Sequence, residues 1–406
     1  MNQRIFGITV AKLRKQRHMT QAELAQKLNV SSKAVSKWET GMGYPEITLL
    51  PKIAAVFGVS VDYLITGERR GITIAGNIIT DIVKRVECYP QMGMLANITS
   101  VSKAIGGCAP NVAIDLAKID PSVPVSVLGC IGDDEYGRYL IAQLQRYNID
   151  TGGVKVTETA PTSFTDVMSL EGGDRTFFHA RGANALFSPG DIDLTSLQCH
   201  ILHIGYILLL DSFDAEDPEY GTVMARFLHK TQEMGIRTSI DVVSDSTGDF
   251  PKKIIPALKY CDYVIINEIE CCNIWGLNSR RSDGTLDIAV LRDAMERTMD
   301  CGVGEKVVVH SKEAGFCLSY DGTWTAVPSL HIPTSQIKGS VGAGDAYCAG
   351  CLYGIYHQYP DREMLEFASA AAACNLFAEN AVDGMRSRQE ILQLMSDCPR
   401  QTISEV

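Results

Sequence analysis

From residue 72 onward the chain alternates short, wholly apolar runs with stretches of helical periodicity, and this alternation constrains the fold more than any other feature. Six runs have the composition of buried strands, namely "ITIAG", "VSVLGCIG", "ILHIG", "RTSIDVV", "YVIIN" and "EKVVVH". Stretches between them, such as "YLIAQLQRY", repeat apolar residues every three or four positions. This pattern predicts an α/β fold with a doubly wound, mostly parallel sheet and helices on both faces.

Two regions depart from that pattern and alternate apolar with polar residues. They are "DIVKRVECYP" with "NITSVSKAIGG" (81–107), and "TSFTDVMSLEGGDRTFFHA" (162–180), which contains an "EGGD" turn. A period of two with one polar face is typical of exposed strands. We expect a small accessory β-sheet that acts as a lid over a site.

The first seventy residues have the pattern of several short helices. Thr20 and Glu23 form a capping box for one helix, and Ser31 begins a second, which Gly41 ends. Two short helices joined by a tight turn form a helix-turn-helix. The second helix exposes hydroxyl and amine side chains, which suit phosphate and base-edge contacts in a major groove.

The charge distribution divides the chain at the same place. Residues 1–70 contain 11 Lys and Arg against 5 Asp and Glu, whereas the remainder contains 26 against 43. We therefore expect only the first part to meet nucleic acid. The predicted organisation is an all-α domain over residues 1–68, a polar hinge at 69–71 and an α/β domain over 72–406.

Composition also indicates the compartment. The longest apolar stretch, "ILHIGYILLL", is too short to span a bilayer, and the N-terminus lacks the pattern of a signal peptide. Thirteen cysteines without framework spacing suggest reduced thiols in a cytoplasmic protein without membrane contact. "CAGC" (348–351) is interpreted as two packing residues, with redox or metal use as the alternative.

The stretch "GSVGAGDAYCAG" (339–350) carries the strongest chemical signal. Its glycines lead into a helix, and a helix N-terminus with free backbone N–H groups binds anions. Asp345 is expected as the first residue of that helix. It is either an ordinary N-cap or a base that stands beside a phosphoryl group.

Three further motifs place polar groups at the ends of predicted elements. "GNIITD" ends a strand with Asp81, "GGCAPNVAIDLAKI" opens a helix, and "IINEIE" ends a strand with Asn267 and Glu270 three residues apart. Each also has a purely structural interpretation as a turn, a cap or a polar strand end. There is no P-loop and no dinucleotide-binding glycine pattern.

Taken in order, these motifs resemble the ribokinase-like PfkB family of carbohydrate and nucleoside kinases over about residues 72–395. The resemblance implies that Asp345 takes the proton from the substrate hydroxyl. It assigns transition-state stabilisation to the backbone N–H groups of Gly342, Ala343 and Gly344. It assigns substrate hydroxyls to Asp81, Gly106, Gly107 and Asn111. By the same resemblance, Asn267 and Glu270 hold Mg²⁺ and its waters around the phosphates of ATP. Gly315 lies in the loop that passes the nucleotide.

The first segment resembles the Cro and phage-repressor (XRE-type) helix-turn-helix family along nearly all of its length. By this resemblance the domain binds double-stranded DNA as a dimer on paired half-sites. The residues placed at the DNA are Gln21, Ser32, Lys33, Ser36 and Lys37.

Three departures from the PfkB pattern bear on ligands. Gly339-Ser340-Val341 replaces the Asp-Thr-Thr of many members, which puts a monovalent-cation site in doubt. His310-Ser311-Lys312 replaces the usual nucleotide turn. Cys108 replaces a lysine, which favours a neutral polyol over a sugar phosphate, while Arg175, His179 and Arg181 near the lid keep a phosphorylated substrate open.

Three functions remain open from the sequence. The first is an ATP-dependent sugar or nucleoside kinase that carries a DNA-binding domain and regulates its own pathway. The second is a transcriptional regulator whose kinase-like domain senses a ligand without turnover. The third makes the first domain a protein-interaction module.

Overall fold

The computed structural model describes residues 2–170, 175–243 and 250–403, and the chain divides into two compact units. The first comprises Met1–Gly71 with the segments Ile192–His200 and Glu233–Ile236. The second comprises Ile72–Asp191, Ile201–Gln232 and Arg237–Val406. The first unit reaches Gly71, the last residue of the expected hinge, but it also contains two segments that were expected in the second domain.

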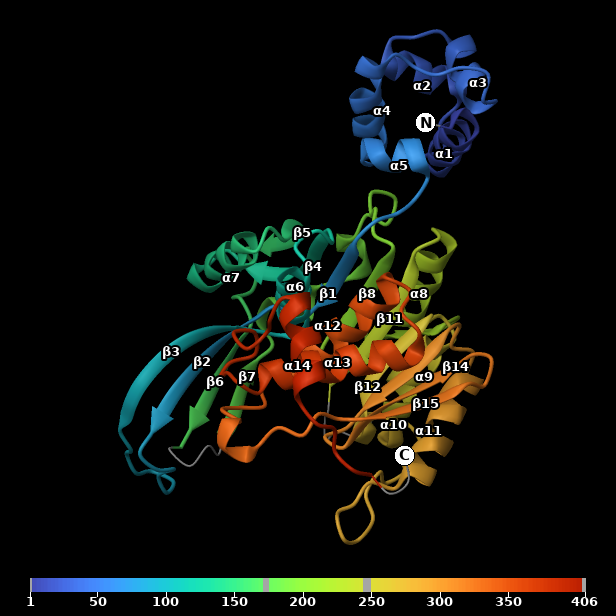
Figure 1. Ribbon diagram of the computed structural model, residues 1–406. Helices are drawn as coiled ribbons and strands as arrows, with labels where there is room; N and C mark the ends of the chain where they lie inside the picture. Colours follow the sequence, from blue (N-terminus) through green and yellow to red (C-terminus); the bar gives the residue numbers. More distant parts are fainter. Residues whose placement is uncertain (1, 171–174, 244–249, 404–406) are drawn as a thin grey trace. The chain divides into compact units, whose positions relative to one another are not determined.

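The first unit is built from short helices (Figure 1). They are α1 (Gln3–Gln16), α2 (Gln21–Leu28), α3 (Ser32–Glu39), the 3-10 turn η1 (Ile47–Leu49), α4 (Leu50–Phe57) and α5 (Val61–Thr66). The predicted capping box is present, because Thr20 Oγ1 accepts from the Glu23 N–H at 3.2 Å and Glu23 Oε2 accepts from the Thr20 N–H at 2.7 Å. Asn29, in the left-handed conformation, ends α2 and makes the tight turn.

The core of this unit explains the spacing of its apolar residues. Phe6 and Val10 of α1, Val35 of α3, and Ile53 and Phe57 of α4 are fully buried in one cluster. Helix α1 was not anticipated from the sequence, although its Phe6, Val10 and Leu13 follow the helical period. A basic helix with a narrow apolar stripe gives a weak signal on its own.

The second unit contains a nine-stranded sheet in the order β15-β14-β13-β12-β11-β8-β1-β4-β5. All six predicted strands are present in it, and the pairs from β5 across to β13 are parallel. The bounds are β1 (Ile72–Gly76), β4 (Val125–Gly132), β5 (Asp150–Thr157), β8 (Ile201–Ile207), β11 (Arg237–Val242), β12 (Tyr263–Asn267), β13 (Lys306–His310), β14 (Ala314–Ser319) and β15 (Trp324–Pro328). Strands β14 and β15 are antiparallel and close one edge.

The predicted accessory sheet is also present, as four strands in the order β3-β2-β6-β7. Their bounds are β2 (Ile79–Val86), β3 (Ile98–Gly106), β6 (Phe164–Ser169) and β7 (Arg175–Ala180). In Figure 1 these strands extend away from the large sheet as one curved layer. The "EGGD" turn expected between β6 and β7 lies outside the described residues.

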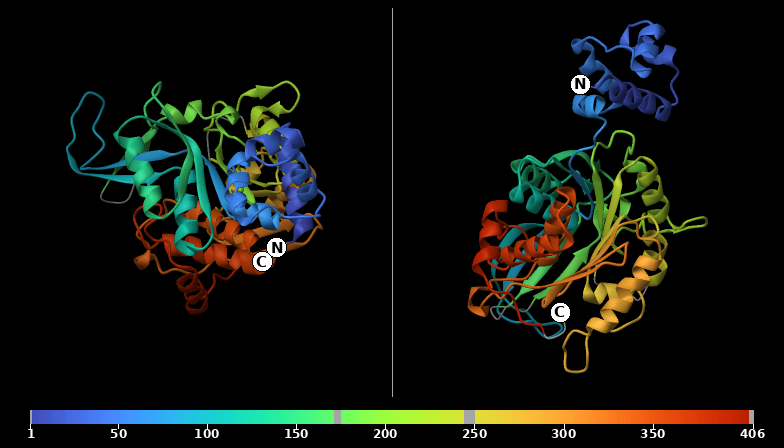
Figure 2. Two further views of the ribbon diagram at one scale, coloured as in Figure 1. Left: turned by 90° about the horizontal axis from the view of Figure 1, so that it is seen from above. Right: turned by 45° about the vertical axis from the view of Figure 1, so that its right-hand side comes forward.

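Helices cover both faces of the large sheet, as Figures 1 and 2 show. Helices α6, α12 and α13 lie on one face and share an apolar cluster with β1, β4 and β8. On the other face lie α8 to α11. The bounds are α6 (Cys108–Ile119), α7 (Glu135–Arg146), α8 (Val223–Glu233), α9 (Phe250–Leu258), α10 (Glu268–Asn273), α11 (Ile288–Asp300), α12 (Ala343–Tyr356), α13 (Asp361–Asn375) and α14 (Arg388–Asp397).

Minor elements complete the second unit. They are the 3-10 turns η2 (Gly182–Leu186), η3 (Pro189–Asp191) and η4 (Thr334–Gln336) and a two-stranded hairpin of β9 (Glu216–Asp217) and β10 (Gly221–Thr222). Among the helices that the structure describes, none is both long enough and apolar enough to cross a bilayer.

Candidate active site

Helix α12 begins inside the glycine-rich stretch and brings Asp345 into the interior. Gly342 is the N-cap, with φ of +77°, so Asp345 is the third helical residue and neither the first residue nor the N-cap. A side chain at Gly342 would place its Cβ 2.6 Å from backbone atoms of Ala381. Glycine is therefore required there both by the left-handed backbone and by close packing.

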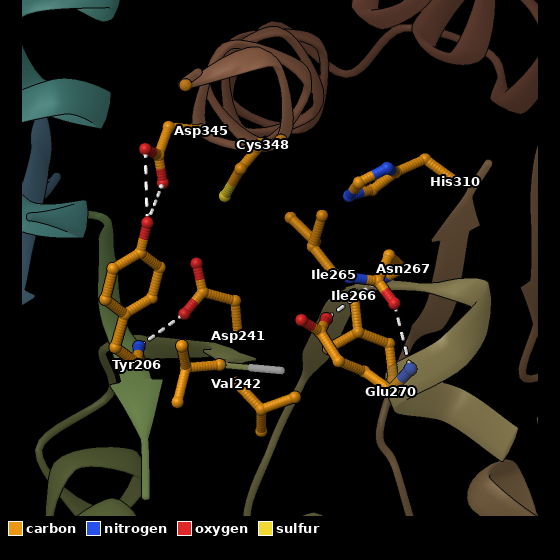
Figure 3. Close-up of a pocket in the computed structure, with 13 residues that line it drawn as sticks. Tyr206, Asp241, Val242, Ile265, Ile266, Asn267, Glu270, His310, Asp345 and Cys348 are labelled. Carbon is orange, nitrogen blue, oxygen red and sulfur yellow. Dashed lines mark hydrogen bonds between the residues drawn. The ribbon is translucent and has the colours of Figure 1, made fainter. Parts of the chain in front are cut away.

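The Asp345 carboxylate is buried and held by two donors from other elements. Asn111 Nδ2, in the first turn of α6, donates to Oδ2 at 2.8 Å. The Tyr206 hydroxyl, at the end of β8, lies 3.1 Å from Oδ1 and 3.3 Å from Oδ2 (Figure 3). The pKa of Asp345 is raised to about 7, chiefly by burial and also by the charge of Asp241, although the hydrogen bonds from Asn111 and Tyr206 oppose the rise. A carboxyl group with such a pKa exchanges protons at neutral pH.

A cavity of about 250 Å³ opens next to this carboxylate. Figure 3 shows Asp345 and Cys348 of α12 on one side and Asn267 and Glu270 on another. Asp241, at the end of β11, also lines the cavity. Polar groups from β11, β12 and α12 meet here because the carboxyl ends of parallel strands share one edge of a sheet.

Asn267 is the last residue of β12, as expected, and it is also the N-cap of α10, whose third residue is Glu270. Asn267 caps α10, its Oδ1 accepts from the Glu270 N–H at 2.8 Å, and Glu270 Oε2 accepts from the Asn267 N–H at 2.9 Å. Both residues line the cavity. An amide oxygen and a carboxylate are oxygen ligands of the kind that Mg²⁺ and its water shell prefer.

The backbone amides expected at the anion site differ in their availability. Gly342 and Gly344 line the cavity together with Asp345. The Ala343 N–H donates to the Ser340 carbonyl at 3.2 Å, and Ala343 lines a neighbouring cavity instead. Of the three expected residues, Gly342 and Gly344 thus line the cavity that Asp345 lines, whereas the Ala343 N–H is already paired.

That neighbouring cavity, of about 400 Å³, is mostly apolar. Leu330, Ile332 and Leu376 contribute to its walls, and His310 and Gly344 line both cavities. Burial lowers the pKa of His310 to about 4, so its ring is neutral. Because the two cavities share His310 and Gly344, an apolar compartment lies next to a polar one.

Gly315 was expected in a loop beside the nucleotide, and this placement is wrong. It lies within β14, opposite His310 in the antiparallel pair, and is not among the described residues that line either cavity. The turn beside the apolar cavity is formed by Ser311 and Lys312. The sequence placed the turn too late because β14 begins already at Ala314.

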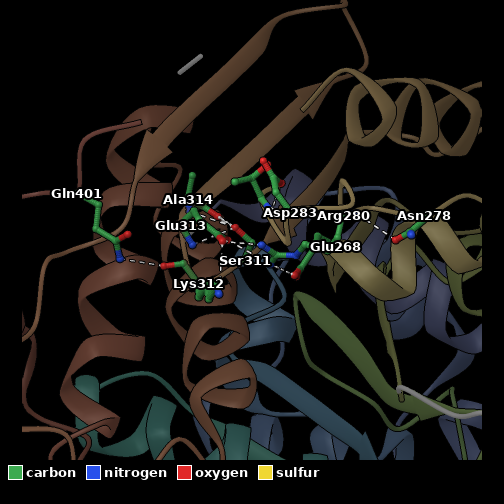
Figure 4. A network of polar contacts seen from close by, with 10 residues as sticks. Glu268, Asn278, Arg280, Asp283, Ser311, Lys312, Glu313, Ala314 and Gln401 are labelled. Carbon is green, nitrogen blue, oxygen red and sulfur yellow. Dashed lines mark hydrogen bonds and ion pairs between the residues drawn. The ribbon is translucent and has the colours of Figure 1, made fainter. Parts of the chain in front are cut away.

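Arg280 fixes this turn to α10 (Figure 4). Its Nη1 and Nη2 contact the two carboxylate oxygens of Glu313 at 2.5 and 3.1 Å, and Nη2 also contacts Glu268. Glu268 is the residue after Asn267. A bridging guanidinium therefore couples the cap of α10 to the turn at residue 311.

Asp81 lies in a third cavity, of about 350 Å³, lined largely by the strands of the accessory sheet. It belongs to β2, opposite Ala104, and does not end β1 as expected. Burial raises its pKa to about 6. A Cβ at Gly106 would lie 2.3 Å from Asp81 Oδ2, so glycine is needed for the close approach.

Of the four predicted substrate residues, Asp81 lines this cavity, whereas Gly106, Gly107 and Asn111 are not among the described residues that line it. Gly107 is the N-cap of α6. Asn111 is committed through Nδ2 to Asp345, whereas its Oδ1 is buried with no partner among the described residues. An acceptor left open next to the candidate base suits a substrate hydroxyl.

Cationic side chains line the Asp81 cavity, but they differ from those considered in the sequence. They are Arg85, Lys103 and Lys338. His179 faces Thr165, 3.0 Å away, and Arg181 pairs with Asp211. Cys108, which replaces a lysine, is therefore no guide to the charge of this cavity.

In the first unit, α3 presents the predicted polar face. Ser32, Lys33 and Lys37 are exposed and Ser36 is half-buried, while Val35 and Trp38 face the core. Gln21 is half-buried, and its Nε2 donates to Glu39 Oε2 at 2.8 Å. Four of the five side chains thus share one short helix, with Gln21 beside it.

Sequence analysis did not single out Tyr206 or Asp241. Tyr206 has φ of +62° and donates its N–H to Asp241 Oδ1 at 2.5 Å. The signal available was that polar residues follow apolar strand runs, as in "HIGY" and "SID". Such strand ends are common, which is why the pattern alone does not identify them.

Comparison with known proteins agrees with this architecture. Residues 70–388 match the pfkB family of carbohydrate kinases, and residues 10–64 match a helix-turn-helix family. The chain is 24% identical over 327 residues to a ribokinase of Schizosaccharomyces pombe, covering 79% of this chain and 96% of that protein. It is 22% identical over 311 residues to a 5-dehydro-2-deoxygluconokinase of Geobacillus kaustophilus, covering 72% and 85%. The structure of an Arabidopsis thaliana ribokinase complexed with ribose and ATP superimposes with a TM-score of 0.66 at 21% identity, covering 80% and 99%.

Proposed function

The chain belongs to the PfkB family of carbohydrate kinases, and we propose that residues 72–406 catalyse ATP-dependent phosphorylation of a hydroxyl group on a sugar or nucleoside. The observation that carries this proposal is the setting of Asp345. Its carboxylate is buried at the start of α12, beside a polar cavity and between donors from α6 and β8.

We assign the proton transfer to Asp345. With a pKa of about 7, the carboxylate is half ionised at neutral pH and accepts the hydroxyl proton as the oxygen attacks. Asn111 and Tyr206 hold it in one orientation. The N–H groups of Gly342 and Gly344, at a helix N-terminus, stabilise negative charge on the transferred group.

The two neighbouring cavities fit a nucleotide. The apolar space of about 400 Å³ suits a flat base, and the polar space suits phosphates, with Asn267 and Glu270 toward Mg²⁺ and its waters. ATP supplies the phosphoryl group, and Mg²⁺ offsets its negative charge. Arg280 keeps the turn at residue 311 in place.

The substrate is proposed to bind in the Asp81 cavity beneath the accessory sheet. Asp81 accepts hydrogen bonds from hydroxyl groups in this cavity, and the open Oδ1 of Asn111, beside Asp345, accepts one from the hydroxyl that reacts. Arg85, Lys103 and Lys338 suit a carboxylate or phosphate on the same molecule, although Arg85 also pairs with Glu379 and Lys103 with Glu135. Sugar acids therefore stand beside neutral sugars as candidates.

We propose that residues 1–68 bind double-stranded DNA through α3, as a homodimer, and that the protein is cytoplasmic. The support is the exposed Ser32, Lys33 and Lys37 on a helix-turn-helix and the basic charge of this segment. Ligand binding in the second domain would then regulate transcription. Unchanged operator affinity in the presence of saturating substrate and ATP would refute that coupling.

The experiment is ADP release with Mg-ATP across free sugars, sugar acids, sugar phosphates and nucleosides. Turnover with one class establishes the kinase and names the substrate group. Melting temperature is measured on the same panel. A compound that raises the melting temperature without turnover would support the second function, a ligand-sensing regulator on a kinase fold. The observation that favours this alternative is Gly339, which stands where many PfkB members have an aspartate.

A further inference from the structure

A cluster of three metal-ligating side chains lies beneath the nucleotide cavity and takes no part in the proposed transfer. His203 is on β8, Asp241 on the neighbouring β11 and Cys348 on α12. Their exposed fractions are 0%, 7% and 2%. One ligand atom from each lies within 4.8 Å of the others.

The distances match those between ligands of one tetrahedral metal ion. His203 Nε2 is 3.5 Å from Asp241 Oδ2 and 3.6 Å from Cys348 Sγ. A tetrahedral zinc ion with Zn–N of about 2.0 Å and Zn–S of about 2.3 Å separates these donor atoms by about 3.5 Å. The corresponding separation for nitrogen and oxygen is about 3.3 Å. The two observed separations from His203 Nε2 therefore agree with one shared ion to within a few tenths of an ångström, and the carboxylate and sulfur ligand atoms lie within 4.8 Å of each other.

Neighbouring groups already orient the ligands. The Ser239 hydroxyl lies 2.9 Å from His203 Nδ1, which fixes the ring so that Nε2 faces the other two residues. The Tyr206 N–H occupies Oδ1 of Asp241, so that Oδ2 remains for the cluster. Such second partners set the tautomer of a ligating histidine and the direction of a ligating carboxylate.

The cluster has an entry path and an open position. Asp241 and Cys348 line the cavity of about 250 Å³, and Figure 3 shows both facing it. Three protein ligands with a fourth position open to a cavity are typical of accessible zinc sites. An anion in the cavity can complete the coordination.

We propose that His203, Asp241 and Cys348 bind a thiophilic divalent metal ion, of which Zn²⁺ is the representative. A thiolate and an imidazole select Zn²⁺ or Co²⁺, whereas Mg²⁺ requires oxygen ligands. The site is therefore distinct from the oxygen pair Asn267 and Glu270. The "CAGC" motif takes part through one cysteine only, since Cys351 is outside the cluster.

The test uses full-length protein freed of metal with a chelator and then titrated with Co²⁺. We expect one equivalent to produce a thiolate-to-cobalt absorption band in the near ultraviolet and intense visible bands of four-coordinate cobalt. Zn²⁺ should remove these bands, and a large excess of Mg²⁺ should not. Absence of the thiolate band would overturn the proposal.

Variants identify the ligands. Cys348→Ala and His203→Gln should lose the site, whereas Cys351→Ala, equally buried in the same helix, should retain it. Ser239→Ala should keep the thiolate band and weaken binding by about 10- to 100-fold, because it removes only an orienting partner. A band that persists in Cys348→Ala would contradict the assignment.

A measurement on the unmodified protein keeps the result independent of how the variants fold. X-ray absorption at the zinc edge should show one sulfur and a shell of nitrogen and oxygen ligands. A zinc-loaded protein without a sulfur ligand would refute the site and leave a hydrogen-bonded triad without metal. Kinase turnover is not needed for any of these measurements.

Discussion

Replacing Tyr206 with phenylalanine should raise the pH at which the kinase becomes active. The Tyr206 hydroxyl lies 3.1 and 3.3 Å from the two oxygens of Asp345, and it stabilises the ionised form. Without it the pKa of Asp345 rises, because one of the two hydrogen bonds that oppose the effect of burial is lost. Since Asp345 must be ionised to accept a proton, the activity of Tyr206→Phe should appear at higher pH than that of the wild type.

The magnitude follows from the strength of the lost bond. A hydrogen bond to a charged group contributes about 1.5–3 kcal/mol, which corresponds to about one to two pKa units. The acid limb of kcat/KM should therefore move from near pH 7 to about pH 8–9. At pH 7 the ionised fraction falls from about half to about 1–10%, so that the rate falls about 5- to 50-fold.

The assay is kcat/KM from ADP release between about pH 5.5 and 9.5, on protein freed of thiophilic metals, with the substrate found on the panel. The matched control is Tyr353→Phe, another buried tyrosine of the second unit, whose hydroxyl donates to Asp120 at 3.1 Å. It should leave the acid limb in place. An unmoved limb in Tyr206→Phe, or a loss equal at every pH, would refute the role given to Tyr206.

Three further predictions concern stability, the α12 turn and DNA. Because burial raises the pKa of Asp345 from 3.8 to about 7, its stabilising contribution is present below about pH 4 and lost as the pH rises to 7. The free energy of unfolding of Asp345→Asn, measured in urea, should thus equal that of the wild type at pH 4 and exceed it by about 4 kcal/mol at pH 8. A variant less stable than the wild type at pH 8 would contradict this. Gly342→Ala should lower both kcat (at least about tenfold) and the melting temperature, unlike Gly190→Ala, whose Cβ would meet Ser188 Oγ at an ordinary contact distance of 3.6 Å. Lys33→Ala and Lys37→Ala should each reduce the slope of log K against log salt concentration for DNA binding by about one, whereas the control Lys52→Ala on α4 should leave it unchanged. If the slopes of the α3 variants equal that of the wild type, α3 does not contact DNA.

Much of the fold follows from local patterns in the sequence. The six apolar runs are six strands of the large sheet, and the two alternating regions form the accessory sheet. A strand buried on both faces is apolar throughout, and a strand buried on one face alternates apolar with polar residues, so both kinds can be identified from the sequence. The antiparallel edge formed by β14 and β15 was not predicted. Their strands are short and separated by a turn, so they give no crossover pattern.

The candidate site was predictable where one motif contains the whole arrangement. Asp345, Gly342 and Gly344 meet because they are adjacent in the chain. Tyr206 and Asp241 come from other strands, and only the register of β8 against β11 brings them to Asp345. Long-range register is not written in any single stretch of sequence, and for the same reason the His203, Asp241 and Cys348 cluster appears only in the folded chain.

The central claim is that Asp345 is the base in phosphoryl transfer, and the most direct measurement compares the rate of ADP release in the wild type and in Asp345→Asn at saturating substrate and Mg-ATP. Both proteins should show the same rise of melting temperature with substrate, so that binding is controlled. The account predicts a loss of about 10²- to 10⁴-fold in kcat, the range for removal of a general base. An Asp345→Asn variant that binds substrate and turns over within a few fold of the wild type would contradict it.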